Sequence, residues 1–494
     1  LSSTNIRIYN LIFFNFRKPN MILLSFFVLL CFTCRLGHGV GLHGFHFYGL
    51  EEPRSLSQSA SENITELWIR QPVDHFNVRD NRTWLMRYYE NSRYFKKNGP
   101  ILIMIGGEWE ISKGFLEAGL MYELASTYNA IMYYTEHRYY GKSKPTEDTS
   151  TRNLQYLNVD QALADLAYFI ETRKKDEKLQ NSKVIVFGGS YAGNVATWVR
   201  LKYPHLVQGA LASSAPVLAK VDFYEYYEVV TESLRRHSQK CVDEVKAAFD
   251  EVQELLAIKG GPEKLKEYFN YQYLSNQEFA GIVQYDKVEN NRTKIAACCE
   301  NMTSSYLGSP LQRLAHLVSN KNKCLENNYD KFVAVYRNET WDSQPDISTL
   351  WFYQTCTEYG YYQTTNSRKS VFGTLFPFTC YKTYCLIFSR EIVHKLYRLS
   401  YSYGNRLLYT RIERTNTMYG GLRPDLQNVI FTNGDVDPWH VLSVLQDLNA
   451  FSPAILIKGS SHCRDLYSDL DTDVEDLIQA RAKVRKIIGT WISS

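Results

Sequence analysis

The chain has 494 residues, which is long enough for one large elaborated domain or for two domains. Its 56 basic and 52 acidic residues give a formal net charge of +4, and basic residues gather only in short clusters such as Arg173-Lys174-Lys175. This composition is typical of a globular protein and gives no support for nucleic acid binding.

The N-terminal part of the chain is expected to be a targeting segment. Residues 22–33 form a mostly apolar run of 12 residues, which is too short to span the ~30 Å hydrocarbon core of a membrane as a helix. The small residues Gly37 and Gly39 follow, so we expect a signal peptide within residues 1–40, cleaved near Gly39. The sequence has no second apolar run of spanning length, so no integral membrane segment is expected in the mature chain.

Cysteines and glycosylation sequons indicate a secretory route. Removal of Cys31 and Cys34 with the signal leaves eight of the ten cysteines, and their spacing fits disulfides better than a zinc site. Five Asn-Xaa-Ser/Thr sequons are candidate glycosylation sites: Asn63, Asn81, Asn291, Asn301 and Asn338. The predicted location is therefore the secretory pathway, ending in a lysosome or endosome or outside the cell.

Short apolar runs along the chain predict buried parallel strands. The runs expected to form strands are 101–105, 130–134, 183–187, 208–212, 428–432 and 454–458. Helical patterns alternate with them, among them 194–202, a stretch around 440–449 and a closing helix at 474–491. This alternation is typical of an α/β fold with a doubly wound sheet.

A helical insertion is expected to interrupt this pattern at 217–424. Between residues 241 and 258, apolar side chains recur at helical spacing from Val242 to Leu256, as on one buried helix face. Without the insertion, residues 60–216 and 425–494 make one α/β domain of ordinary size. We expect the insertion to cover the C-terminal edge of the sheet as a lid, because such folds bind ligands at this edge. Seven of the eight mature cysteines lie in it, so Cys463 either pairs with one of them or at least one thiol stays free.

The segment 188–193, with the sequence GGSYAG, lies between a predicted strand and a predicted helix. This is the layout of a nucleophile elbow, in which a sharp turn exposes the hydroxyl of a serine, here Ser190, and glycines permit the strained backbone. The match to GxSxG is imperfect, because Ala192 occupies the place of the last glycine.

A serine needs a base and a carboxylate, and hydrolases of this fold carry them in the order Ser, Asp or Glu, His, each after a strand. Two aspartates follow the strand at 428–432, and of these Asp437 is favoured over Asp435 because Pro438 stiffens the loop behind it. After the strand at 454–458 comes His462, which is preferred as the base over His440 because His440 lies only three residues from Asp437.

Two backbone donors are expected to stabilise the oxyanion. Tyr191 supplies the N–H after the nucleophile, and Gly106 and Gly107 follow the strand at 101–105, where absent side chains let the backbone approach a substrate oxygen. Glu108 continues this loop and is assigned to substrate binding.

Taken together, these motifs resemble the prolyl carboxypeptidase family of serine peptidases over nearly the whole mature chain. The resemblance rests on seven segments: Gln71-Pro-Val-Asp-His-Phe-Asn77, Gly106-Gly107-Glu108, Glu136-His-Arg-Tyr-Tyr-Gly141, the GGSYAG elbow, Cys356-Thr-Glu-Tyr-Gly-Tyr-Tyr-Gln363, Asn433-Gly-Asp-Val-Asp-Pro-Trp439 and Gly459-Ser-Ser-His462. It implies an α/β-hydrolase fold with a helical, disulfide-containing lid inserted between nucleophile and acid. It also implies Ser190, Asp437 and His462 as the triad, and thereby Asp437 rather than Asp435.

Within the family, His462-Cys463 looks most like the thymus-specific serine protease branch, since the better-known members carry paired histidines there. Trp439, and Tyr359 in the aromatic segment 351–362, are candidates for the substrate pocket, with core packing as the alternative. The expected function is a serine-type exopeptidase that hydrolyses short peptides through an acyl-enzyme, with cleavage after proline left open. A lipase or esterase of the same fold and a non-catalytic binding protein are the alternatives. No cofactor or metal is predicted, and a homodimer is left open.

Overall fold

The computed structural model describes residues 50–53, 63–269, 282–289, 292–318, 339–341, 347–375 and 401–494. The expected signal peptide, the sequons at Asn291 and Asn338, and Cys324, Cys380 and Cys385 lie outside these residues, as do parts of the expected insertion.

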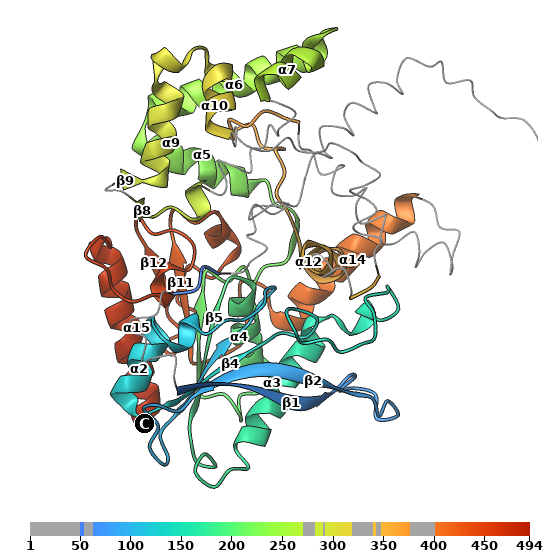
Figure 1. Cartoon of the computed structure of the whole chain (residues 1–494), viewed down its shortest axis with the longest axis vertical. Helices are drawn as coiled ribbons and strands as arrows, with labels where there is room; N and C mark the ends of the chain where they lie inside the picture. The colour runs from blue at the N-terminus through green and yellow to red at the C-terminus, as the bar shows by residue number, and fades with distance from the viewer. Residues whose placement is uncertain are drawn as a thin grey trace, which may run out of the picture.

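An eight-stranded sheet forms the centre of the molecule, with the strand order β1-β2-β4-β3-β5-β6-β11-β12 (Figure 1). Its strands are β1 (Ile64–Pro72), β2 (Thr83–Asn91), β3 (Ile101–Ile105), β4 (Ile131–Thr135), β5 (Val184–Gly189), β6 (Gly209–Ser213), β11 (Val429–Gly434) and β12 (Ala454–Ile457). The six predicted strands are confirmed as β3 to β6, β11 and β12, and neighbours among them pair in parallel. Strands β1 and β2, which were not predicted from the sequence, add an antiparallel edge.

Burial explains why five of the six predicted strands could be recognised, whereas β12 is only partly buried and was recognised from its apolar residues alone. Every residue of β3, β4, β5, β6 and β11 is buried, so each appears in the sequence as a short apolar run. By contrast, β1 lies at the edge and mixes exposed with buried positions, and a mixed pattern of this kind gives a weaker signal.

Helices cover both faces of the sheet. The helices that cover the two faces are α2 (Leu120–Tyr128), α3 (Val159–Arg173), α4 (Tyr191–Lys202) and α15 (Glu475–Ser493). The connection from β3 to β4 runs toward the β1 edge, whereas the connections from β4 to β5 and from β5 to β6 run the other way. Right-handed crossovers therefore place α2 on one face and α3 and α4 on the other, and α15 packs beside α2 (Figure 1).

Between β6 and β11 the chain forms the predicted helical insertion. Its helices are α5 (Glu225–His237), α6 (Gln239–Ala257), α7 (Gly261–Phe269), α9 (Lys294–Thr303), α10 (Pro310–Val318), α12 (Ile347–Gln354) and α14 (Tyr401–Tyr419). Short strands accompany them: β7 (Lys220–Asp222), β8 (Val288–Glu289), β9 (Arg292–Thr293) and β10 (Gly360–Tyr362). Figure 1 shows α5, α6, α9 and α10 grouped beyond one end of the sheet, with α12 and α14 at its side.

Helix α6 confirms the apolar stripe expected between residues 241 and 258. Val242, Val245, Phe249 and Val252 are buried, while Leu256 is only partly buried. A disulfide between Cys241 and Cys299 joins α6 to α9. Cys356 is also disulfide-bonded.

The thiol of Cys463 is free and buried, as is that of Cys298. Of the two alternatives for Cys463, a free thiol is therefore the one that the structure shows.

The prediction of a helix around residues 440–449 was wrong. Only a short 3-10 helix, η6 (Pro438–Leu442), forms there. Ser443 then adopts an extended conformation, and the Asn433 side chain holds the chain in a bend by donating to the Val444 carbonyl. Tertiary hydrogen bonds thus override a weak helical pattern.

Candidate active site

Ser190 lies in the strained turn that the elbow predicts. It follows the last residue of β5 and precedes α4, with φ 58° and ψ −131°, a backbone conformation that non-glycine residues rarely adopt. Its N–H donates to the Ser213 carbonyl of the neighbouring strand at 2.9 Å, which ties the turn to the sheet.

The glycines around Ser190 explain why Ala192 is tolerated. A Cβ atom at Gly188 would lie 2.0 Å from the Ala192 carbonyl oxygen, and one at Gly193 would lie 2.8 Å from the Ala215 Cβ. A Cβ atom at Gly189 would lie 2.6 Å from Leu50 Cδ1, so the close approaches of this turn fall at its three glycines. Ala192 is itself fully buried and does not disturb the elbow.

The acid and base candidates meet at the ends of β11 and β12. His462 Nδ1 donates to Asp437 Oδ2 at 2.8 Å, and the backbone N–H of Trp439 donates to Asp437 Oδ1 at 3.0 Å. Both side chains are buried. Because Nδ1 carries the proton, Nε2 is left with the lone pair that a general base needs.

The electrostatics of His462 are dominated by this pairing. Burial by itself would lower the pKa of the imidazole, but the Asp437 charge, reinforced by the neighbouring Cys463 and the hydrogen bond from Nδ1, raises it well above its ordinary value. Asp437 thus both orients the ring and stabilises its protonated form.

The alternative acid and base have other partners. The Asp435 carboxylate accepts from Arg236 Nη1 at 2.7 Å and from the Gly459 N–H at 2.7 Å. His440 Nδ1 contacts the backbone carbonyl of Asp437, not its carboxylate. The geometry therefore favours Asp437 and His462 over both alternatives.

Contacts between loops bring His462 toward the elbow. A Cβ atom at Gly189, the residue before Ser190, would lie 3.0 Å from the Sγ of Cys463, the residue after His462. No hydrogen bond between Ser190 Oγ and His462 is recorded within the part of the chain that the structure describes. Such catalytic hydrogen bonds are often long until substrate binds.

Of the expected oxyanion donors, Gly106 already has a partner. Its N–H donates to the Thr135 carbonyl at 2.8 Å, which extends the pairing of β3 with β4. Tyr191 begins α4, where the first N–H groups of a helix have no partner within the helix. The donors that remain are therefore the N–H groups of Tyr191 and Gly107.

The two aromatic pocket candidates are fully buried. Trp439 packs against Phe223, Tyr226 and Tyr361, all from the insertion. Tyr359, in the π-helix η5 (Thr355–Tyr359), packs against Tyr191, Trp198, Trp351 and Tyr361. In the structure both residues belong to the aromatic core between the insertion and the sheet. This agrees with the alternative that their role is core packing and not substrate binding.

A segment of the insertion that was not among the predicted site residues holds the His462 loop. This segment, residues 282–287, is here called the strap. The Gln284 carbonyl accepts from the His462 N–H at 2.9 Å, and the Asp286 carbonyl accepts from Ser461 Oγ at 2.6 Å. The Tyr285 ring lies edge-on to the His462 ring, with 6.0 Å between centroids. Backbone acceptors leave no mark in a sequence, which explains the omission.

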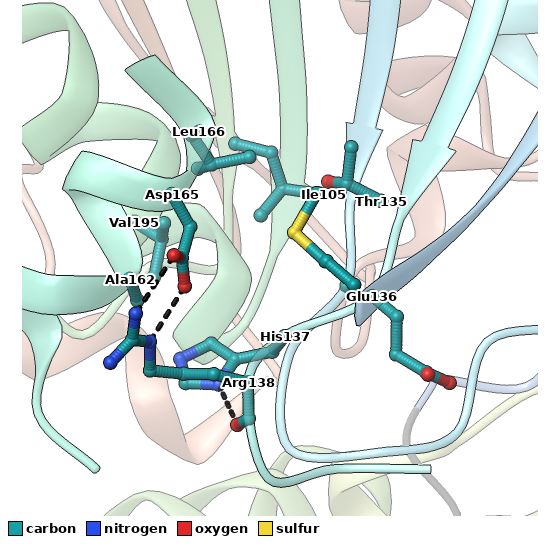
Figure 2. A pocket seen from close by; sticks show the side chains of 11 residues that line it. Ile105, Thr135, Glu136, His137, Arg138, Ala162, Asp165, Leu166 and Val195 are labelled. Carbon is teal, nitrogen blue, oxygen red and sulfur yellow. Dashed lines mark hydrogen bonds and ion pairs between the residues drawn. The ribbon is translucent and has the colours of Figure 1, made fainter. Parts of the chain in front are cut away.

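A buried ion pair behind the elbow was also missed. Figure 2 shows Arg138 and Asp165 at one wall of a small cavity, with two hydrogen bonds between them. The Arg138 Nε–Asp165 Oδ2 distance is 2.6 Å, and His75 Nε2 lies 2.7 Å from Asp165 Oδ1. Gln71 donates to the Asp165 carbonyl. The conspicuous segments 71–77 and 136–141 thus join β1 and the loop after β4 to α3 and have a structural role.

Comparison with known proteins agrees with this arrangement. The family model described as serine carboxypeptidase S28 matches residues 71–484. The chain belongs to the serine carboxypeptidase S28 family. It is 35% identical to the thymus-specific serine protease of Mus musculus over 465 residues, which cover 86% of this chain and 87% of the relative. It is 29% identical to the lysosomal Pro-X carboxypeptidase of Homo sapiens over 465 residues, 89% of this chain and 90% of that protein.

Family membership makes the protein a serine-type peptidase with the α/β-hydrolase fold, as the sequence predicted. None of the helices within the described ranges has the length and apolar character needed to cross a membrane.

Proposed function

We propose that Ser190, Asp437 and His462 act as the catalytic triad of a peptidase that hydrolyses short peptides through an acyl-enzyme. The observation that carries this proposal is the hydrogen bond between His462 Nδ1 and Asp437 Oδ2, from two loops that follow adjacent parallel strands. A strained serine at the turn after β5 supplies the nucleophile on the same edge of the sheet.

In this mechanism His462 Nε2 removes the proton from Ser190 Oγ as Oγ attacks the peptide carbonyl carbon. The N–H groups of Tyr191 and Gly107 stabilise the resulting oxyanion. His462 then passes the proton to the leaving amine, and the C–N bond breaks to give the acyl-enzyme. A water molecule activated by His462 hydrolyses this ester and restores Ser190.

The substrate class is expected to be short peptides, cleaved near one end. The insertion lies over the loops of the triad and supplies the strap that contacts His462, so a folded protein would have to displace it. Cleavage after proline is included in the proposal because one relative is named a Pro-X carboxypeptidase. A lysosomal or extracellular location belongs to the same proposal, with Asn63 and Asn81, both exposed, as glycan sites. A homodimer remains a prediction, which sedimentation velocity can test.

Labelling with an organophosphonate tests the triad. The wild-type protein is expected to be labelled at one serine, and Ser190→Ala to abolish labelling while the circular dichroism spectrum is unchanged. A folded wild-type protein that never reacts would contradict the proposal and favour a non-catalytic binding protein. A panel of peptides and acyl esters separates the remaining alternative, since rapid ester turnover without peptide cleavage would indicate a lipase or esterase.

A further inference from the structure

Glu108 is a buried carboxyl group without a full set of partners. It follows Gly107 in the loop after β3, and only 3% of its surface is exposed. Among the residues that the structure describes, none forms a hydrogen bond with its Oε2 atom. The loop is held firmly, because the Trp109 ring packs onto Gly107 and Trp109 Nε1 donates to Tyr134 Oη at 2.8 Å. A fixed buried oxygen without a partner is costly unless a ligand supplies one.

The surroundings of Glu108 favour its neutral form. No lysine or arginine of the described chain acts on its carboxyl group, and the charged group that does is His462. The nearby hydroxyl groups of Tyr140 and Tyr191 have other partners, since Tyr140 Oη donates to Gln354 and Tyr191 Oη lies 3.0 Å from His137 Nε2. Burial raises the pKa of Glu108 to about 7, and the His462 charge lowers it only in part.

A neutral carboxyl group in this position is a hydrogen-bond donor that lacks an acceptor. Backbone carbonyl groups that could accept this hydrogen bond occur all along a peptide, but the C-terminal carboxylate is the anionic and therefore stronger acceptor that every peptide with a free C-terminus carries. It is the ligand that a neutral Glu108 fits best. An N-terminal ammonium group would instead require the ionised form, which burial disfavours. Glu108 is next to Gly107 and within the electrostatic range of His462, so a group bound to it lies close to the scissile bond.

We propose that the protonated carboxyl group of Glu108 donates a hydrogen bond from Oε2 to the C-terminal carboxylate of the bound peptide. The enzyme then releases residues from the C-terminus, and its preference for a free C-terminal carboxylate over an amide is greatest where Glu108 is protonated. This inference rests on the proposed function, because it states which end of the peptide is bound while the same triad cleaves it.

The experiment compares two substrates that differ only at this end, benzyloxycarbonyl-Pro-Phe as the free acid and as the C-terminal amide. Their kcat/KM ratio is measured from pH 5 to pH 9. Because the same triad cleaves both, the titration of His462 cancels in the ratio. In the wild-type enzyme the ratio of acid to amide is expected to fall as pH rises through about 7, since an ionised Glu108 repels the substrate carboxylate.

Two variants separate hydrogen bonding from charge. Glu108→Gln keeps a donor but cannot ionise, so the preference for the acid is expected to persist at pH 5 and to lose its decline near pH 7. Glu108→Leu is expected to reduce the ratio at pH 5 by roughly ten- to one-hundredfold, the size of one hydrogen bond to a charged group. Glu52→Gln is the matched control, because the pKa of Glu52 is also raised to about 7 by burial while Tyr134 and the Phe115 N–H serve as its partners.

Three results would overturn the inference. Equal losses on acid and amide in Glu108→Leu would make Glu108 a structural residue. If Glu108→Leu loses activity only on dipeptide coumarin amides with a free N-terminus, Glu108 would instead bind the N-terminal ammonium group of the substrate. If the phosphonate labels the wild-type enzyme although neither substrate is cleaved, the measurement is instead how well each peptide protects Ser190 from labelling. Equal protection by the acid and the amide would also refute the inference. Absence of labelling itself would count against the triad instead.

Discussion

Three residues of the site share an unusual backbone conformation. Ser190, Ser214 and Cys463 all have positive φ angles, of 58°, 48° and 57°. Each such residue costs on the order of 1–3 kcal/mol, so the surrounding structure must hold it in place. Ser190 N–H donates to Ser213, Ser214 N–H to Thr432, and Cys463 N–H to Ser214 Oγ. The strained residues are thus tied to the strand ends and to one another, which fixes the nucleophile turn relative to the base loop.

The pairing of Asp437 with His462 leads to a prediction about pH. The base must be neutral to accept a proton, so kcat/KM rises with pH through the pKa of His462, which Asp437 raises. Asp437→Asn is expected to move this acid limb to lower pH and to lower kcat by about a thousand- to ten-thousandfold, because the ring loses its orientation. pH–rate profiles of both enzymes measure the two effects. An unmoved acid limb would mean that another group controls it.

Most of the candidate triad could be predicted because its residues follow strands that the sequence reveals as apolar runs. The choice of Asp437 over Asp435 could not be made from the two residues alone. It depends on Arg236 and Gly459, which engage Asp435 from distant parts of the chain. The place of Trp439 and Tyr359 in the aromatic core was equally hidden, since aromatic side chains in a pocket and in a core have the same spacing.

Among the elements, the strap joins the insertion to catalysis. Tyr226 of α5 donates from its hydroxyl group to Gln284 Oε1 at 2.5 Å, while the Gln284 carbonyl accepts from the His462 N–H. Tyr226→Phe leaves the buried Gln284 oxygen without this donor and is expected to let the strap and His462 shift. We expect kcat to fall roughly tenfold or more, since small misplacements of a catalytic group are costly.

The control for this variant is Tyr168→Phe, which removes the hydroxyl of a more exposed tyrosine on α3. It is expected to leave kcat at the wild-type value. If Tyr226→Phe raises KM and leaves kcat unchanged, the strap contributes to substrate binding and not to the position of His462.

The buried ion pair of Arg138 and Asp165 joins three elements, and its loss should be felt in stability. Arg138→Met leaves Asp165 buried with only His75 beside it, and the free energy of unfolding at pH 7 is expected to fall by about 3–5 kcal/mol. Lys142→Ala, which removes an exposed ion pair with Glu66, should cost at most about 1 kcal/mol. Urea unfolding of both variants makes the comparison, and equal losses would contradict it.

The pH dependence of this loss has a definite sign. Burial would raise the pKa of Asp165, but Arg138 and His75 together hold it below its ordinary value, so the wild-type protein gains stability from this group above about pH 4. This gain disappears as pH falls through the pKa of the folded state. The difference between wild type and Arg138→Met should therefore shrink in acid.

At the level of elements, burial on both faces made most of the predicted strands recognisable, but not all: β12 was found although it is only partly buried, and β2 was missed although most of its residues are buried. The strands β3 to β6 and β11 were found because they are buried throughout, whereas β1 was missed because it mixes exposed and buried positions. The stretch 440–449 was misassigned because side-chain bonds from Asp437 and Asn433 set its backbone, and such bonds have no periodicity.

The whole molecule combines a rigid sheet with an insertion that contacts both the acid loop and the base loop. Arg236 of α5 pairs with Asp435 beside the acid, and the strap holds His462. The aromatic side chains of Phe223, Tyr226 and Tyr361 pack onto Trp439 between them. Ordering of the insertion and competence of the triad should therefore be coupled.

The disulfide between Cys241 and Cys299 tests whether the insertion is a unit of its own. It closes a loop with a sequence separation of 58 residues, for which chain entropy gives a stabilisation of about 4 kcal/mol. In a variant with both Cys241→Ala and Cys299→Ala, we expect faster hydrogen exchange in α6 and α9, unchanged exchange in β3 and β5, and lower peptidase activity because the strap loosens. Cys298→Ala, which removes a buried free thiol in the same helix, is the control and should leave exchange in α6 close to wild type. Equal acceleration in β5 would mean that insertion and sheet unfold together, and the boundaries at 217 and 424 would then not delimit a separate domain.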